Sequence, residues 1–547
     1  MSESPGSESN TEARNTRPGT KFGTAASATS NHYDAIVIGS GIGGLTTASI
    51  LSRIAGKRVL LLERHFKVGG FTHVFKRKDY MWDVGIHYIG GMQEGSMLRN
   101  LINWLTEGNL KWNKMGEPFE KFVYPDLTIP VHSPEERFRE TLKEKWPEEG
   151  KGIDRYFSDV KATAGWFGRH VTLKAMPSFL EKLSSPIEIP GRHGALMTTK
   201  EYLEHRFKSP ELRAVVASQW GDYGLPPSQS AFVIHSLIVA HYLDGGFYPV
   251  GGSGNIAKYI MPKIQENGGK CLLYHDVKEI LLDDGRAVGV RAEHTSGKTH
   301  EMVEFYAPVI VSDAGMKNTL TRMVPESFRI PFRKELAEFS QGTSNVTLYL
   351  GLKDSPERAG IQGENYWAYR SFDHEENYNR RNELLEGRAS GFYASFPSLK
   401  DPDASSHTAE IISFVDYAPF EPWKEKEWKN RGDDYQSLKD RITKALIDRS
   451  KEVLPGLADL IDYTELSTPV TNEHFSGHPA GSIYGLVCSP ERFKKEWIGI
   501  RTPVDGLFIT GADASSPGFA GAMMGGFGCA SQVMGLKGMM RLFKEMK

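Results

Sequence analysis

The spacing of apolar and polar residues near the start of the chain predicts a strand, a helix and a second strand in that order. Residues 34–38 form a short apolar run rich in β-branched side chains, which is typical of a buried parallel strand. Residues 45–54 carry apolar side chains at helical spacing, and residues 58–62 form a second apolar run that ends at Glu63. This order predicts a βαβ unit and therefore an α/β fold.

Three glycines with G-x-G-x-x-G spacing, Gly39, Gly41 and Gly44, connect the first strand to the helix. Gly39 allows the tight turn, Gly41 lets a pyrophosphate approach the backbone, and Gly44 lets the helix pack closely on the strand. Gly43 lies in the same loop, and the helix begins there with free N–H groups and a positive dipole end. Glu63 is placed to accept hydrogen bonds from an adenosine ribose. We predict a dinucleotide site; the alternative is a glycine-rich turn without a ligand.

A second glycine-rich segment covers residues 67–92. Gly69 and Gly70 predict another close approach between the backbone and the cofactor. Residues 75–82 have the pattern of a hairpin, and residues 98–105 have helical spacing.

The next part of the chain, residues 138–207, is polar and mostly helical in pattern. Within it, residues 164–183 alternate apolar side chains with basic ones such as Arg169, Lys174 and Lys182. A basic amphipathic stretch of this kind suits a helix at a membrane surface or at a substrate entrance. An ordinary helix that faces the core explains the pattern equally well, and both interpretations stay open.

Short apolar runs in the second half of the chain predict two groups of strands. We expect four strands in the nucleotide-binding part, at residues 270–274, 277–282, 287–292 and 304–312. Three more, at residues 346–352, 391–396 and 410–416, are separated by long charged loops and predict an antiparallel sheet on the substrate side.

The C-terminal segment returns to the pattern of a nucleotide-binding unit. Residues 507–510 predict a short buried strand, followed by the glycine-rich sequence GADASSPGFAGAMMGGFGCA. Asp513 can bond a sugar hydroxyl of a ribityl chain, and the helix that starts after it can face the carbonyl edge of a flavin. A glycine-rich helix-packing segment is the alternative.

Composition and charge narrow the class of protein. The 547 residues are enough for two or three packed subdomains. Lys and Arg total 66 against 68 Asp and Glu, a formal net charge of −2, so we expect no nucleic-acid partner. Apolar runs of the length that spans a membrane, about 18 or more residues, are absent from the sequence.

The three cysteines, Cys271, Cys488 and Cys529, lack the spacing of metal ligands or of a disulfide framework. We therefore predict no metal site. Residues 1–32 are rich in Ser, Thr, Gly and Asn and have no apolar core of a secretory signal, so we expect a disordered tail and a cytoplasmic location.

The two glycine-rich ends of the chain together resemble the FAD-dependent amine-oxidase-like superfamily. The middle narrows the resemblance to the carotenoid and retinoid oxidoreductases, which include phytoene desaturases, carotenoid isomerases and retinol saturases. Three stretches are most similar to the retinol saturase branch: WDVGIHYIGGM at residues 82–92, WGDYGLPPSQSAFVIHSLIVAHYLDGGFYPVGGS at 220–253 and VSDAGMKNT at 311–319.

This resemblance implies a Rossmann-like FAD-binding domain with an inserted α+β substrate domain. We assign residues 33–135, 245–325 and 501–547 to the FAD-binding domain, 136–244 to a mainly helical substrate or membrane-contact region, and 326–500 to a mixed-sheet substrate domain. The residues expected to hold FAD are Gly39, Gly41, Gly43, Gly44, Glu63, Arg64, Gly69, Gly70, Val277, Asp513 and Met524.

The implied chemistry is hydride transfer to or from a C=C bond of a lipophilic polyene, with FAD as hydride carrier and NAD(P)H or another reductant as electron source. One proton must also move, and His87, His235 and His241 are the candidates. His235 and His241 are six residues apart on one predicted helix, so at most one should reach the substrate. For each histidine, the alternative is a hydrogen-bonded core residue.

Several functions stay open on this scaffold. The main expectation is a retinol-saturase-like oxidoreductase with a lipophilic substrate and a peripheral membrane contact. A carotenoid cis–trans isomerase and a phytoene-type desaturase are alternatives, and a non-enzymatic prenyl or lipid carrier is a remote one.

Overall fold

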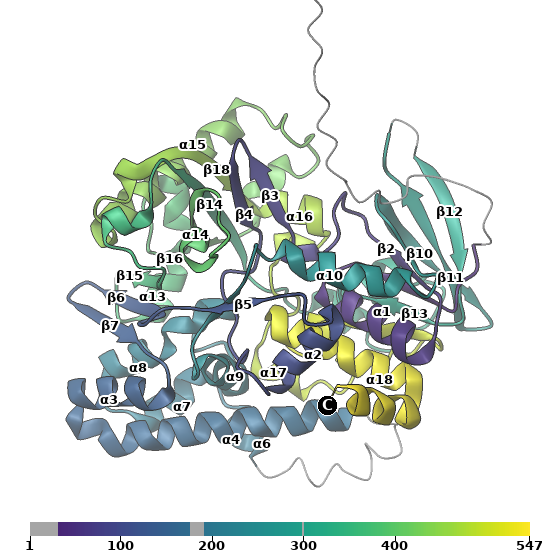
Figure 1. The fold of residues 1–547 in the computed structure, drawn as a ribbon, viewed down its shortest axis with the longest axis horizontal. Coiled ribbons are helices and arrows are strands. Elements are labelled where there is room, and N and C mark those ends of the chain that lie inside the picture. Colours follow the sequence, from purple (N-terminus) through teal and green to yellow (C-terminus); the bar gives the residue numbers. More distant parts are fainter. Residues whose placement is uncertain (1–30, 175–190, 298–299, 547) are drawn as a thin grey trace, which may run out of the picture.

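The computed structural model describes residues 31–174, 191–297 and 300–546 (Figure 1). Its nucleotide-binding part is built on a five-stranded parallel sheet with the strand order β19-β13-β1-β2-β9. The bounds are β1 Ala35–Ile38, β2 Val59–Leu62, β9 Lys270–Leu272, β13 Ile310–Ser312 and β19 Leu507–Ile509. Segments from both ends of the chain therefore share one sheet, with β1 at its centre.

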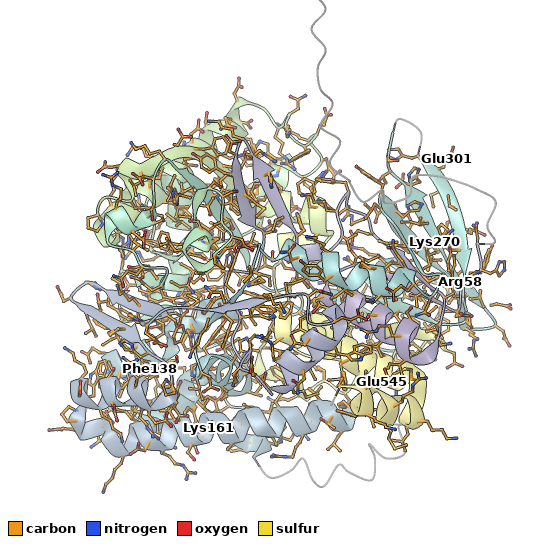
Figure 2. All side chains as sticks on the ribbon, in the orientation of Figure 1. Arg58, Phe138, Lys161, Lys270, Glu301 and Glu545 are labelled. Atoms are coloured by element: carbon orange, nitrogen blue, oxygen red, sulfur yellow. The ribbon has the colours of Figure 1, made fainter. Side chains whose placement is uncertain are left out.

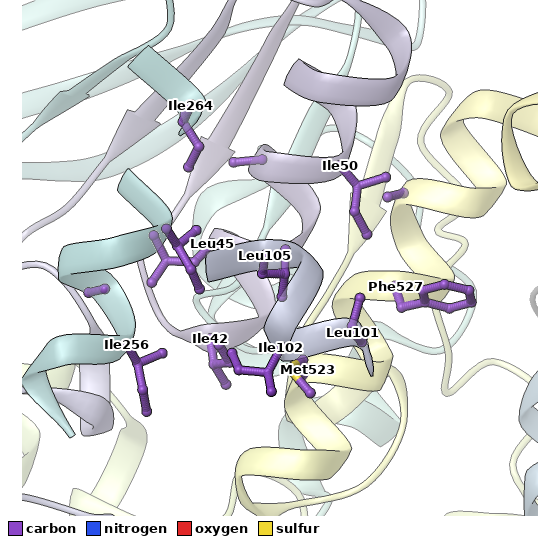
Figure 3. Close-up of a cluster of buried hydrophobic side chains, with 14 of the residues drawn as sticks. Ile42, Leu45, Ile50, Leu101, Ile102, Leu105, Ile256, Ile264, Met523 and Phe527 are labelled. Carbon is purple, nitrogen blue, oxygen red and sulfur yellow. The ribbon is translucent and has the colours of Figure 1, made fainter. Parts of the chain in front are cut away.

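Four helices cover the parallel sheet and supply its hydrophobic core: α1 Ile42–Ala55, α2 Met97–Thr106, α10 Gly254–Gln265 and α18 Gly518–Glu545. Figure 3 shows how their side chains meet, with Leu45 of α1, Leu105 of α2, Ile256 of α10 and Met523 of α18 in one buried cluster. Packing from four separate segments fixes the end of β1, where α1 begins.

A three-stranded antiparallel sheet flanks this unit, formed by β10 His275–Asp283, β11 Arg286–His294 and β12 Glu301–Tyr306. Our prediction of one strand at residues 304–312 was wrong. The chain divides there into β12, which pairs with β11, and β13, which enters the parallel sheet. Pro308 lies between them and has no N–H to donate to a strand ladder.

The substrate side contains a seven-stranded mixed sheet with the order β18-β14-β17-β16-β15-β6-β7. The bounds are β6 Glu120–Tyr124, β7 Leu127–Val131, β14 Ser344–Leu352, β15 Asn365–Tyr369, β16 Gly391–Ser395, β17 His407–Val415 and β18 Ile461–Ser467. Neighbouring strands are antiparallel except β6 and β15. β6 and β7 lie within residues 33–135, which we had assigned to the FAD-binding domain, so that boundary is too late in the chain.

Two short antiparallel strand pairs and a long helix complete the fold. β3 Val74–Arg77 pairs with β4 Tyr80–Asp83, as the sequence predicted, and β5 Trp112–Lys114 pairs with β8 Phe247–Pro249. Helix α15, Asp433–Val453, contributes to the hydrophobic cluster on the seven-stranded sheet. Short helices occupy the connections: α6 Arg192–Ala195, α11 Met316–Asn318, α12 Arg333–Glu338, α13 His374–Asn379, α14 Pro397–Lys400, α16 Pro469–Ser476 and α17 Pro490–Lys494.

A helical layer lies along one edge of the molecule, at the bottom of Figure 1: α3 Glu135–Lys145, α4 Gly150–Lys174, α7 Thr199–Arg206, α8 Pro210–Ala217 and α9 Phe232–Tyr242. In Figure 2, Lys161 marks α4 and Glu545 marks the end of α18. Helix α4 covers the first part of the basic amphipathic stretch, and residues 175–183 lie outside the described residues.

The large aromatic side chains of α4 face inward. Trp166 and Phe167 are buried against Ala231 and Val233. The core-facing interpretation therefore holds for these two residues, and they offer no apolar surface to a membrane. Among residues 31–174, 191–297 and 300–546, no helix combines the length and apolarity that crossing a membrane requires.

Candidate functional site

One large cavity runs between the parallel sheet and the seven-stranded sheet. Its volume is about 2210 Å³, and its wall includes the glycine loop after β1 and the aromatic side chains of β15 and β16. Pockets for single small molecules are typically about 300–1,000 Å³. The cavity is therefore large enough for a dinucleotide and a second, lipophilic molecule together.

The glycine loop can adopt its shape only without side chains. A Cβ atom on Gly41 would lie 2.5 Å from Asp313 Oδ2, and one on Gly70 would lie 3.0 Å from the Cα atom of Gly41. Gly39 has a φ of 93°, which L side chains rarely adopt, and a Cβ on Gly44 would overlap the carbonyl oxygen of Gly39. The loop therefore presents bare backbone at the start of α1, where Gly39 and Gly41 line the cavity, an arrangement that fits a pyrophosphate.

The same loop is packed against the C-terminal segment. A Cβ on Gly43 would overlap Gly511, and one on Gly526 of α18 would lie 2.5 Å from the carbonyl oxygen of Gly43. Gly43 also lines the cavity, whereas Gly44 is not part of the wall formed by the described residues. Gly44 thus acts in packing the helix on the strand, the function that its spacing predicted.

Glu63 lies at the end of β2 with its carboxylate held in a fixed orientation. Its Oε2 atom accepts hydrogen bonds from the Ser40 N–H at 2.9 Å and hydroxyl at 2.6 Å, and Oε1 accepts one from the His65 N–H at 2.8 Å. Burial raises the pKa of Glu63, and the hydrogen bonds from Ser40 and His65 oppose that shift. Our sequence analysis missed Ser40, whose only local signal is its position directly after the Gly39 turn.

The other predicted cofactor residues also lie on the cavity wall. Arg64 and Val277 line one end, where Arg64 Nε lies 3.8 Å from Asp276 Oδ1. Gly69, with a φ of 120°, and Met524 of α18 line the wall as well. The structure thus brings residues from four distant segments to one surface.

Asp513 joins three segments of the wall. Its Oδ2 atom accepts a hydrogen bond from the Met316 N–H at 2.8 Å, and Oδ1 accepts one from the Leu486 N–H at 2.9 Å. The guanidinium of Arg492, almost fully buried, lies 4.0 Å from Oδ1. Sequence analysis missed Arg492, because nothing near it in the sequence distinguishes it from a surface arginine.

A second carboxylate, Asp313, lies at the N-terminus of α1. Burial raises its pKa to about 7, hydrogen bonds from the backbone of Gly44 and Gly41 oppose the shift, and the nearby carboxylates of Glu63 and Asp513 add to it. Asp313 follows β13, at the same edge of the parallel sheet as the glycine loop. That position after a buried parallel strand is the signal that could have identified it.

We expect Asp313 to make dinucleotide affinity depend on pH. Below pH 7 the carboxyl is mostly protonated and neutral, whereas above pH 7 its negative charge would repel a phosphate bound at the glycine loop, beside the carboxyl groups of Glu63 and Asp513. The affinity of the wild-type protein for FAD should therefore fall by about tenfold per pH unit above the pKa of Asp313. Asp313→Asn should bind FAD more tightly at pH 8 and with a flatter pH dependence.

Titration of the apoprotein with FAD at pH 6, 7 and 8, followed by flavin fluorescence, measures this effect. Asp448→Asn is the control, because Asp448 lies on α15 and is not part of the cavity wall formed by the described residues. Equal pH dependence in wild type and Asp313→Asn would contradict the prediction.

Of the three predicted histidines, His87 has the geometry of a positioned proton carrier. It lines the cavity, and its Nδ1 atom lies 2.6 Å from Oε2 of Glu410 on β17. Glu410 is fully buried, which raises the pKa of its carboxyl, while the partnership with His87 opposes that shift. Sequence analysis did not predict Glu410, which is 323 residues away in the chain.

His241 and His235 lie on α9 in different environments. His241 lines the cavity, but Nε2 accepts a hydrogen bond from the Gly90 N–H at 2.9 Å, and burial lowers its pKa to about 4. It is therefore neutral at pH 7. His235 is not part of the cavity wall formed by the described residues. Its ring bonds the Tyr156 hydroxyl at 2.8 Å, and burial lowers its pKa to about 3, so we withdraw it as a proton donor.

The remaining wall is mostly aromatic and apolar. Tyr88 stacks on Tyr242 with ring centroids 4.3 Å apart, and Trp367 packs against Tyr393 at 4.6 Å. Leu237 of α9 adds aliphatic surface. Flat aromatic side chains of this kind suit a conjugated apolar ligand.

Comparison with known proteins decides the family. The all-trans-retinol 13,14-reductase of Danio rerio is 34% identical over 546 residues, which cover 94% of this chain and 88% of that protein. The human all-trans-retinol 13,14-reductase is 33% identical and covers 92% of this chain and 85% of its own. The chain belongs to the all-trans-retinol 13,14-reductase family. The profile of the NAD(P)-binding Rossmann-like domain matches residues 37–105, which include the glycine loop.

More distant relatives of the chain have other descriptions. A chloroplastic prolycopene isomerase of Arabidopsis thaliana is 26% identical over 89% of the chain and 80% of that protein. A Danio rerio protein described as an inactive all-trans-retinol 13,14-reductase is 27% identical over 92% of the chain and 86% of that protein. Similarity to these relatives therefore does not by itself establish activity, which depends on the residues of the site.

A solved structure of putrescine oxidase shares the fold of the all-trans-retinol 13,14-reductase family. It superposes with a TM-score of 0.62 at 15% identity and covers 92% of this chain and 99% of its own. The predicted resemblance to carotenoid and retinoid oxidoreductases and the predicted α/β fold class are both confirmed.

Proposed function

We propose that this protein is an FAD-dependent oxidoreductase that reduces a C=C bond of a retinoid or related polyene. The observation that carries the proposal is a single cavity with a glycine cradle at one part of its wall and the His87–Glu410 pair at another. The names of the relatives at 33–34% identity support a retinoid alcohol as the substrate.

The residues of the cavity wall fit FAD. The bare backbone at Gly41 and Gly70 can receive a pyrophosphate. Oε1 of Glu63 accepts one hydrogen bond, from the His65 N–H, and has a second lone pair that can accept one from a ribose hydroxyl. Asp513 and Met524 would lie along the ribityl chain and the ring system. When bound and reduced, FAD supplies a hydride and thereby two electrons. NAD(P)H or another reductant is the proposed source of those electrons.

His87 would supply the proton that accompanies the hydride. Because Nδ1 is bonded to Glu410, Nε2 is the nitrogen left for the substrate. The buried carboxylate of Glu410 fixes the plane of the imidazole. Addition of one hydride and one proton across a C=C bond gives a saturated C–C bond with two more hydrogens.

Flavin spectroscopy tests this proposal. The purified protein should show flavin absorption, and adding all-trans-retinol anaerobically to the reduced protein should restore the oxidised spectrum. A colourless protein would contradict the cofactor assignment. A reduced flavin that retinol leaves unchanged would contradict the reductase assignment.

Cis–trans isomerisation of a polyene is the second candidate, favoured by the prolycopene isomerases among the relatives. Such a reaction leaves the flavin reduced after turnover and the mass of the polyene unchanged. The experiment above therefore separates the two.

We further propose a peripheral membrane contact at one opening of the cavity. Met97 of α2 and Phe543 of α18 both line the cavity and are 45% and 42% exposed, respectively. Leu536 and Met540 of α18 are also exposed, and Lys537, on the same helix, can meet anionic lipid headgroups. This rim supports direct transfer of a lipophilic substrate from a bilayer.

Sedimentation with vesicles of phosphatidylcholine and phosphatidylserine measures this contact. Leu536→Glu with Met540→Glu should weaken vesicle binding by about 10²- to 10⁴-fold, because each of the two apolar side chains contributes about 1.5–3 kcal/mol when fully buried. Met302→Glu is the matched control, since Met302 is 52% exposed on β12, away from the rim. Equal sedimentation of all three proteins would refute the contact.

A further inference from the structure

A polar cluster interrupts the apolar wall beside His87. Tyr88, Asp222 and Tyr393 line the cavity, and the Tyr88 hydroxyl donates a hydrogen bond to Asp222 Oδ2 at 3.2 Å. The Tyr393 ring centroid lies 6.2 Å from that of Tyr88 and 5.6 Å from that of His87. These three side chains, which we call the tyrosine–aspartate cluster, therefore adjoin the proposed proton donor.

The hydroxyl of Tyr393 is the least satisfied member of this cluster. The side chain is 6% exposed, and among the described residues its hydroxyl has no hydrogen-bond partner of normal geometry, since its interaction with Ser395 is loose. By contrast, Tyr369 and Tyr484, in the same cavity, donate to the backbone carbonyls of Ser218 and Gly221. A buried hydroxyl without a partner costs free energy, which a ligand that hydrogen-bonds to it would recover.

Charge at the cluster favours a neutral ligand. Burial and the nearby Glu120 raise the pKa of Asp222 well above its usual value. Glu120 accepts hydrogen bonds from Gln219 Nε2 at 2.8 Å and Trp367 Nε1 at 3.1 Å, and burial raises its own pKa to about 7. An alcohol can donate a hydrogen bond to the Asp222 carboxyl and accept one from the Tyr393 hydroxyl at the same time. A carboxylate ligand would instead lie beside the Asp222 carboxyl on the cavity wall, with Glu120 nearby.

We propose that Tyr88, Asp222 and Tyr393 bind the terminal hydroxyl of the substrate and make the protein selective for polyene alcohols over hydrocarbons and acids. This inference rests on the proposed function. In all-trans-retinol, the hydroxyl-bearing carbon is bonded directly to one carbon of the 13,14 double bond. A site for the hydroxyl must therefore adjoin the group that protonates that bond, as this cluster adjoins His87.

Tryptophan fluorescence provides a binding assay, because Trp220 and Trp367 line the cavity and retinoids quench such fluorescence. The full-length protein is titrated with all-trans-retinol, with its deoxy analogue that carries a methyl group in place of the alcohol, and with retinoic acid. We expect wild type to bind retinol about tenfold more tightly than either of the others. Tyr393→Phe should reduce the preference for retinol over deoxyretinol by about 2- to 10-fold, the effect of one hydrogen bond.

Three further variants test whether the effect is specific to the tyrosine–aspartate cluster. Tyr369→Phe is the matched phenol deletion, and because the Tyr369 hydroxyl is already bonded to Ser218, the preference for retinol should be unchanged. Asp222→Leu should lose most of the preference, and Asp222→Asn, which retains a donor and an acceptor, should keep most of it.

Equal affinity of wild type for retinol and deoxyretinol, or an unaltered preference in Tyr393→Phe, would overturn the inference. If both compounds were bound equally and both were reduced, the inference would fail while the proposed function stood. If neither compound were bound, both would fail.

Discussion

His87→Gln is expected to lower turnover by about 10²- to 10⁴-fold, the usual contribution of a general acid. Glutamine retains much of the shape of the imidazole and can still meet Oε2 of Glu410, which lies 2.6 Å from Nδ1 in the wild type. It has no proton that it can release near neutral pH. Anaerobic single-turnover oxidation of the reduced flavin by retinol measures the rate, and the flavin spectrum shows whether the cofactor is still bound.

His407→Gln is the matched control for this prediction. His407 lies on β17, the strand that carries Glu410, but is not part of the cavity wall formed by the described residues. Its replacement should leave turnover near the wild-type value. Near wild-type turnover in His87→Gln would assign His87 a structural role and require another proton source.

Gly41→Val is expected to abolish flavin binding. The backbone of Gly41, with φ of −61° and ψ of 171°, is open to any residue, so the effect is steric rather than conformational. A Cβ would lie 2.5 Å from Asp313 Oδ2, so the branched side chain would displace that carboxyl group or enter the adjoining cavity. The protein should purify colourless, with its circular dichroism spectrum unchanged.

Gly116→Val provides the comparison, because a Cβ at Gly116 meets no heavy atom within 4 Å. This variant should keep its flavin. A folded Gly41→Val protein that retained the yellow colour through gel filtration would show that the loop after β1 does not hold the cofactor.

The parts of the fold set by local pattern were predictable from sequence. The parallel strands β1 and β2, helix α1 and the β3–β4 hairpin follow from apolar periodicity and glycine positions over a few residues. Pairing between distant segments was not predictable. β6 and β7 join the seven-stranded sheet through β15, which lies more than two hundred residues later, and no local pattern encodes that partner.

The same distinction between local pattern and distant contacts holds for the candidate site. The glycine loop could be recognised from the spacing of its glycines, whereas the positions of Ser40, Asp313 and Glu410 in the site depend on residues that only the fold brings next to them. Helix α9 is an example of a feature that the sequence could not predict. It is apolar almost all round, so the sequence could not tell that His241 faces the cavity while His235 faces Tyr156 in the core.

The most direct test of the proposed reaction is the mass of the product. The protein with reduced flavin is incubated anaerobically with all-trans-retinol, and the extracted retinoid is analysed by chromatography and mass spectrometry. We predict a gain of two hydrogens, with His87→Gln giving almost none of that product in the same time. A retinoid of unchanged mass and altered retention, or one that has lost two hydrogens, would contradict reduction and indicate isomerisation or desaturation instead.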